Sequence, residues 1–164
     1  GPEIGELVRA FVPTRLRRLE VELVVLGRVA KPSRGIRAFL GALERRGFGW
    51  GFSTIMPRYL REPLLDGLDI QPPPASVVCP DDITNRKPHP ETLYRNCRDL
   101  DCAPHEAIYV GDHLRDIEAG RGAGMYTIAA AYGYIEPDDN PDSWGADARA
   151  DHSTTLQQLI LPTD

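Results

Sequence analysis

Apolar residues recur along the 164-residue chain with two alternating periods, one typical of helices and one typical of strands. Helical spacing is found in six segments: residues 3–19, 33–47, 57–68, 90–100, 114–123 and 153–160. Short apolar or β-branched runs, typical of strands, occur at residues 21–29, 48–54, 75–79, 107–110, 126–131 and 146–150. Strands that alternate with helices at this spacing predict βαβ units, and therefore an α/β fold with a parallel sheet.

Two acidic side chains follow the strand predicted at residues 107–110. Gly111 allows the chain to turn, and from Leu114 onward the apolar residues have helical spacing. Asp112 is therefore expected at the tip of the strand, and Asp116 one turn later on the same side. Paired carboxylates at the carboxyl end of a parallel strand suit Mg²⁺ better than zinc or copper. The spacing leaves a second interpretation open, in which Asp112 caps the helix and Asp116 lies beside its positive dipole end.

The composition is that of an ordinary globular domain, with 41% hydrophobic and 26% charged residues. A formal net charge of -5 argues against a nucleic-acid-binding surface. No apolar run reaches the roughly 18 residues that a membrane span needs, and the opening GPEIGELVRA does not resemble a signal peptide. Three cysteines, sparse and odd in number, favour a reducing compartment, so we expect a cytoplasmic protein without a membrane partner.

Two further polar side chains follow predicted strands. Thr54 ends the strand predicted at residues 48–54, and Lys87 lies in the loop that follows the strand at residues 75–79. The carboxyl ends of parallel strands share one edge, so a hydroxyl, an ammonium group and an acidic pair are expected to meet there. This set suits a phosphoryl group, because the hydroxyl donates to it, the lysine balances its charge and Mg²⁺ bridges it to the protein. Taken singly, Lys87 is equally well a surface lysine and Thr54 a helix cap.

Three runs of sequence, STIMPRYLREPLL, NRKPHPETL and IYVGDHLRDIEAGRGAGM, resemble motifs two, three and four of the haloacid dehalogenase superfamily of phosphatases. Within it the chain is similar to the phosphoglycolate phosphatase branch. The runs VVCPDDITNRKPHP and AAAYGYIEPDDNPDSWGADARADH most resemble members assigned to hydrolysis of N-acetylmuramic acid 6-phosphate. The resemblance implies a three-layer Rossmann-like sandwich with a helical cap, in which residues 1–20 are a remnant of the cap and residues 21–164 form the α/β core.

The resemblance also implies roles for the polar residues. Thr54 corresponds to the phosphate-binding hydroxyl and Lys87 to the lysine of motif three, and these two are the implied catalytic residues. Asp112 corresponds to a ligand of Mg²⁺, and Asp116 to the second acid, which supports the metal site or the lysine. The implied activity is Mg²⁺-dependent hydrolysis of a small phosphorylated metabolite, such as phosphoglycolate or a sugar phosphate, with no nucleic-acid partner.

The chain departs from the family pattern at motif one. Members open with a strand that ends in Asp-x-Asp-Gly-Thr, whose first aspartate attacks phosphorus and whose second acts as general acid, and this sequence contains no such run. The Asp-x-Asp spelling that does occur, Asp99 to Asp101, follows a predicted helix and is interpreted as a polar helix end. Ile55 and Met56 stand where the branch has asparagine and lysine, which weakens the expected phosphate contacts.

Two interpretations of this gap stay open. The chain is either the carboxyl-terminal portion of a longer phosphatase, or a short relative in which residues 21–26 replace the missing central strand. In the short relative, Gly27 and Val29 stand where the two aspartates belong, so the chain is expected to have negligible phosphatase activity. The alternative function is a non-catalytic relative that binds a metal, a phosphorylated ligand or a protein. An unfilled central position would expose two strand edges, which predicts a homodimer or a strand-swapped dimer.

Overall fold

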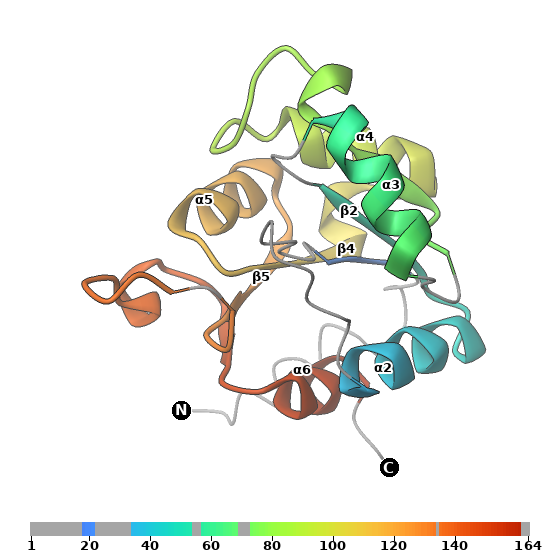
Figure 1. Ribbon diagram of the computed structural model, residues 1–164. Helices are drawn as coiled ribbons and strands as arrows, with labels where there is room; N and C mark the ends of the chain where they lie inside the picture. The colour runs from blue at the N-terminus through green and yellow to red at the C-terminus, as the bar shows by residue number, and fades with distance from the viewer. Residues whose placement is uncertain (1–17, 22–33, 54–56, 69–72, 134, 162–164) are drawn as a thin grey trace.

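The computed structural model describes residues 18–21, 34–53, 57–68, 73–133 and 135–161 (Figure 1). Within these residues, parallel strands form one sheet in the order β3-β2-β1-β4-β5-β6. The strands are β1 (Arg18–Val21), β2 (Gly49–Ser53), β3 (Ser76–Val78), β4 (Ala107–Gly111), β5 (Tyr126–Ala130) and β6 (Ala148–Ala150). The predicted α/β class with a parallel sheet is therefore confirmed.

Helices cover both faces of this sheet, so the molecule has three layers. The α-helices are α2 (Arg34–Arg45), α3 (Arg58–Leu68), α4 (Glu91–Leu100), α5 (Leu114–Ala123) and α6 (Ser153–Ile160). Short 3-10 helices are found at Pro80–Asp82, Pro104–Glu106 and Pro141–Ser143. Figure 1 shows α2 and α6 together on one face of the sheet, and α4 and α5 on the other. None of the helices in the described part of the chain is long and apolar enough to cross a membrane.

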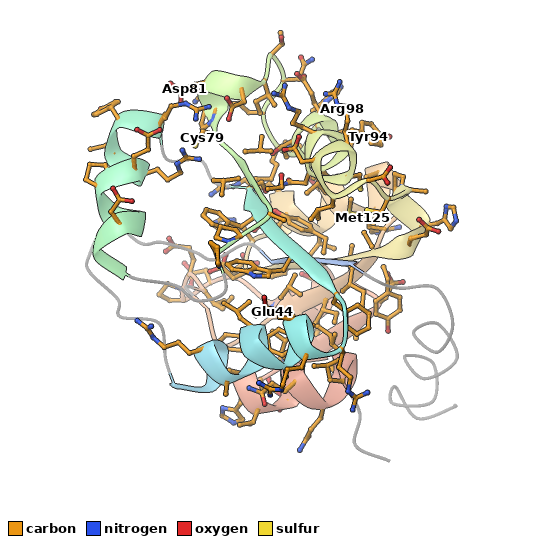
Figure 2. All side chains as sticks on the ribbon, turned by 90° about the vertical axis from the view of Figure 1, so that its right-hand side faces the viewer. Glu44, Cys79, Asp81, Tyr94, Arg98 and Met125 are labelled. Atoms are coloured by element: carbon orange, nitrogen blue, oxygen red, sulfur yellow. The ribbon has the colours of Figure 1, made fainter. Side chains whose placement is uncertain are left out.

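Buried apolar side chains fill the space on each side of the sheet. The cluster under α2 and α6 includes Phe39, Leu40, Leu43, Trp50, Phe52, Ile108, Val110, Ile128, Leu156 and Ile160. The cluster under α4 and α5 consists of Leu93, Cys97, Ala107, Tyr109, Ala119, Ala123 and Met125, with Cys102 packed against it. In Figure 2, Met125 of the second cluster lies on the same side of the sheet as α4, and Glu44 of α2 lies on the other side. Residues of β4 alternate between the two clusters, as expected for a strand covered on both faces.

The helices α4 and α5 both end at a residue in the left-handed conformation. Gly124, with φ of 84°, ends α5, and its N–H bonds back to the carbonyl groups of the last turn. Asp101, with φ of 54°, ends α4 in the same way. Glycine adopts this conformation without a steric penalty, and aspartate tolerates it better than most other residues. These ends lie where the sequence pattern predicted them.

The central position of the sheet is occupied by β1. It pairs in parallel with both β2 and β4, and Val21 lies opposite Val110. The strand predicted at residues 21–29 therefore starts three residues earlier than expected, and its remainder, with Gly27 and Val29, lies outside the described residues. The helix predicted at residues 3–19 is wrong for Arg18 and Leu19, because pairing with two neighbouring strands outweighs a local helical pattern. The division into domains at residue 20 stays a prediction.

One residue of α3 differs from the expectation. The helical spacing of residues 57–68 predicts that Leu60 points inward, but Leu60 is 49% exposed, whereas Arg61 is buried. Leu114, at the start of α5, is likewise exposed. A helix with leucines on several sides has no single apolar stripe, so its contacts with the rest of the fold decide which face is buried.

Candidate functional site

Several polar groups lie at the carboxyl edge of the sheet, where parallel strands end together. β2 ends at Ser53, the loop that follows β3 carries Lys87, and β4 ends at Gly111, directly before Asp112. In parallel α/β sheets this edge is the usual position of ligand sites. Thr54 lies outside the described residues, so its assignment as the phosphate-binding hydroxyl stays a prediction.

Lys87 and Asp116 form a buried ion pair at this edge. The Lys87 Nζ lies 2.9 Å from Asp116 Oδ1, and the two side chains are 3% and 1% exposed. Asp116 is in the first turn of α5, which approaches β4 closely because residue 111 is glycine. A Cβ on Gly111 would lie only 2.3 Å from the Cβ of Asp116. The structure thus brings together two of the predicted site residues, from the loop before α4 and from α5.

Asp112 occupies the tip of β4 and is also buried. The turn that follows β5 packs against its carboxylate, since a Cβ on Gly133 would lie 2.5 Å from Asp112 Oδ2. Burial raises the pKa of the adjacent Tyr132 to about 12, and the negative charge of Asp112 contributes to this rise. The Asp112 carboxylate is therefore flanked by residues 132 and 133.

These residues fit a Mg²⁺ site better than a site built entirely from protein ligands. Mg²⁺ in proteins commonly takes one or two carboxylates and completes its octahedron with waters and phosphate oxygens. The buried carboxylate of Asp112, at the carboxyl edge of the sheet, matches this donor set. Asp116 contacts Lys87, and this geometry agrees with a role in supporting the lysine. Among the described residues, no group of three or more His, Cys, Asp or Glu side chains could hold a metal ion.

The hydroxyl group of Tyr109 links the ion pair to β2. It lies 3.1 Å from Lys87 Nζ, 3.2 Å from Ser53 Oγ and 3.5 Å from Asp116 Oδ1. Sequence reasoning did not assign Tyr109 or Ser53 to the site. For Tyr109 the available signal was a hydroxyl inside the otherwise aliphatic strand β4, because a buried hydroxyl needs a hydrogen-bond partner.

Glu91 holds the loop that carries Lys87. Its Oε1 accepts a hydrogen bond from the backbone N–H of Thr84 at 2.8 Å, and its Oε2 accepts one from the N–H of Asn85 at 2.7 Å. These bonds lower the pKa of Glu91 below its ordinary value. Because Glu91 is the first residue of α4, these bonds fix the loop that contains Lys87 to the start of that helix.

The Asp-x-Asp run at the end of α4 is part of a structural network. Asp99 accepts a hydrogen bond from the Ser76 hydroxyl at 2.7 Å, and Asp101 ends the helix. Asn96, also in α4, donates to the backbone carbonyl of Phe52 in β2 at 3.2 Å. This agrees with the interpretation of Asp99 and Asp101 as a polar helix end.

Residues 6–130 match a family model described as haloacid dehalogenase-like hydrolase. Over 160 residues the chain is 41% identical to an N-acetylmuramic acid 6-phosphate phosphatase of Pseudomonas aeruginosa, covering 98% of this chain and 68% of that protein. Over 158 residues it is 34% identical to a phosphoglycolate phosphatase of Xylella fastidiosa, covering 96% of this chain and 68% of that protein.

The fold of the chain also resembles those of solved structures. The crystal structure of a predicted phosphoglycolate phosphatase from Haemophilus somnus superposes with a TM-score of 0.70 at 23% identity, covering 77% of this chain and 56% of that one. At this level of identity the match shows a shared fold. The chain thus spans between about half and two thirds of the length of these relatives.

Proposed function

Because the chain belongs to the haloacid dehalogenase-like hydrolase family, we propose that it is the phosphate- and Mg²⁺-binding core of a phosphomonoester hydrolase. The buried Lys87–Asp116 pair, at the same edge of the sheet as the buried carboxylate of Asp112, is the observation that carries the proposal. Burying charged groups is costly for a fold, and such groups are concentrated at functional sites.

In this proposal each residue has a separate task. Lys87 neutralises negative charge on the phosphoryl oxygens, and Thr54 donates a hydrogen bond to one of them. Asp116 holds the lysine ammonium group in position. Asp112 would hold Mg²⁺, which when bound supplies positive charge beside the phosphate.

The substrate class is inferred from the relatives. The two relatives described above are named for N-acetylmuramic acid 6-phosphate and for phosphoglycolate. Both compounds are small organic phosphates with a carboxylate. We propose a small phosphorylated metabolite of the sugar-phosphate or phosphoglycolate class as the ligand of this site.

We further propose that this chain alone does not hydrolyse phosphomonoesters. Its sequence contains no Asp-x-Asp-Gly-Thr run, so no carboxylate is available in that pattern to form an aspartyl-phosphate. We expect p-nitrophenyl phosphate turnover by the purified chain to stay at background with Mg²⁺ present. Robust Mg²⁺-dependent turnover that Asp112→Ala abolishes would contradict this.

The same missing run favours a second candidate, a relative that binds a metal, a phosphorylated ligand or a partner protein without catalysis. The two candidates differ in what the gene encodes. An in-frame upstream segment with Asp-x-Asp-Gly-Thr in the genomic DNA would decide for the hydrolase. A stop codon directly upstream in the same frame would decide for the non-catalytic relative.

A further inference from the structure

Tyr109 is a fully buried residue of β4, on the face of the sheet that α4 and α5 cover, and its hydroxyl contacts the proposed site. Three groups surround this hydroxyl: Ser53 Oγ at 3.2 Å, Lys87 Nζ at 3.1 Å and Asp116 Oδ1 at 3.5 Å. They belong to β2, to the loop before α4 and to α5. One side chain therefore contacts three of the segments that form the carboxyl edge.

The chemistry of these groups fixes most of the hydrogen bonding. The ammonium of Lys87 can only donate, so the Tyr109 oxygen accepts from it, and Asp116 Oδ1 accepts from the same ammonium at 2.9 Å. The Tyr109 hydroxyl can in turn donate its proton to Ser53 Oγ or to Asp116 Oδ1. The distance from the Tyr109 hydroxyl oxygen to Asp116 Oδ1, 3.5 Å, is near the limit of a hydrogen bond. The ammonium is thus held from two sides, by α5 and by β4.

We propose that Tyr109 is a positioning residue for Lys87. Its hydroxyl holds the ammonium at the place where the phosphoryl group binds, and its bond to Ser53 fixes that hydroxyl relative to the end of β2. Lysine has a long, flexible side chain, and a hydroxyl that accepts from its ammonium beside Asp116 reduces the number of positions that the ammonium can sample. This inference rests on the proposed function, because it assumes that Lys87 contacts phosphate.

A purely packing role for Tyr109 is the alternative. The ring belongs to the buried cluster with Leu93, Cys97 and Ala119, and the Lys87 Nζ lies 5.8 Å from the ring centroid. Tyr109→Phe keeps the ring in that cluster and the contact of the cation with its face, and removes only the hydroxyl. The variant therefore separates the two roles.

The chain contains only two lysines, Lys31 and Lys87, which makes a direct measurement feasible. In protein labelled with ¹⁵N-lysine, the side-chain ammonium signal of Lys87 is assigned by its loss in Lys87→Met. A buried, hydrogen-bonded ammonium exchanges its hydrogens slowly with water and gives a sharp signal. We expect Tyr109→Phe to broaden or abolish this signal without any ligand present.

The same variant tests the consequence for binding. With Mg²⁺ present, we expect Tyr109→Phe to raise the Kd for inorganic phosphate, measured by calorimetry, about tenfold, the size of one hydrogen bond to a charged group. Ser53→Ala, which removes the contact of the Tyr109 hydroxyl with β2, should change both readouts in the same direction by a smaller factor. It also provides the test should Tyr109→Phe fail to fold.

Tyr126→Phe is the matched control, because Tyr126 begins β5 at the opposite edge of the same sheet. It should leave both readouts unchanged. An unaltered Lys87 signal in Tyr109→Phe, or a phosphate Kd within twofold of the wild type, would overturn the inference. A wild-type protein that binds no phosphate would instead overturn the proposed function, while the ammonium signal would still report whether Tyr109 holds Lys87.

Discussion

The place of the Asp112 carboxylate depends on a residue that has no side chain. Gly133 lies in the turn after β5, where its N–H donates to the carbonyl of Ala130 at 3.0 Å. A Cβ at position 133 would lie 2.5 Å from both the Cβ and the Oδ2 of Asp112. Contacts this short do not occur, so either the turn or the carboxylate would have to move.

Gly133→Ala is therefore expected to disturb the proposed Mg²⁺ site. We expect it to weaken Mg²⁺ binding about tenfold in calorimetric titration, and overpacking of this kind costs about 1–3 kcal/mol. Gly122→Ala is the control, because the nearest atom to a Cβ there is 3.8 Å away and the residue lies in α5. Equal Mg²⁺ affinities in the two variants would refute this assignment of Gly133.

At the same scale, sequence reasoning identified charged residues more readily than neutral ones. Lys87, Asp112 and Asp116 follow strands or begin a helix, and this position marks them in the sequence. Ser53 ends β2 but is neutral, and Tyr109 lies within β4, so their contacts with Lys87 and Asp116 become visible only in the fold. The predicted roles of Thr54, Lys87, Asp112 and Asp116 all stay predictions.

At the scale of elements, α4 and the loop before it form one unit. Glu91 accepts hydrogen bonds from the backbone of Thr84 and Asn85, and a further one from the Asn85 side chain at 2.9 Å. These bonds favour the charged carboxylate, which explains why its pKa lies below the ordinary value of 4.5.

The stability of this unit should depend on pH in a defined direction. Since the folded pKa of Glu91 is below the unfolded one, its contribution is complete above about pH 4.5 and is lost as the pH falls through the folded pKa. We expect Glu91→Gln to lower the thermal midpoint at pH 7, and the difference from the wild type to shrink as the pH falls through the folded pKa of Glu91.

Glu44→Gln is the matched control, because Glu44 is an exposed residue of α2. It lies on the other side of the sheet from α4, where Figure 2 labels Tyr94 and Arg98. Its thermal midpoint should follow that of the wild type across the pH range. A gap between Glu91→Gln and the wild type that is independent of pH would contradict the explanation.

The elements themselves were largely predictable after residue 47. Glycine and proline mark the ends of several helices, and alternating segments of two periods identify the strands between them. The prediction was wrong for Leu60 in α3, which is exposed while the neighbouring Arg61 is buried. The predicted start of β1 was three residues too late. Which residues form this central strand depends on pairing with β2 and β4, and a local sequence pattern does not encode that pairing.

At the scale of the whole molecule, Trp144 joins the segment after β5 to α5. Its side chain is 3% exposed and packs with Ile117 and Ala129. Its Nε1 donates to Asp139 Oδ1 at 2.8 Å. The segment that begins beside Asp112 at Gly133 is thus fixed at its other end by a buried aromatic side chain.

Trp144→Ala should destabilise the protein by about 3–5 kcal/mol, the usual cost of truncating a buried large aromatic residue. Trp144→Phe keeps most of the packing and loses the bond to Asp139, so its cost should be near 1 kcal/mol. Urea denaturation followed by circular dichroism measures both values. A loss below about 0.5 kcal/mol for Trp144→Ala, as for a surface substitution, would show that this contact does not hold the segment.

The homodimer expected from the sequence stays a prediction, and the described sheet bears on it. Its edge strands, β3 and β6, have three residues each. Arg149, exposed on β6, pairs with Asp142 and Asp151. Short and charged edges limit pairing with another chain. With β1 in the central position, we see no open edge between β2 and β4 in the described sheet.

The central claim is that Asp112 and Lys87 form a site for phosphate and Mg²⁺ at the carboxyl edge of the sheet. Calorimetric titration of inorganic phosphate, with and without Mg²⁺, tests it most directly in the wild type, in Asp112→Asn and in the control Asp101→Asn, which changes an exposed helix end. The account predicts that Mg²⁺ tightens phosphate binding in the wild type and in Asp101→Asn, but has no effect in Asp112→Asn. Phosphate binding that is independent of Mg²⁺ and unaffected by Asp112→Asn would contradict it.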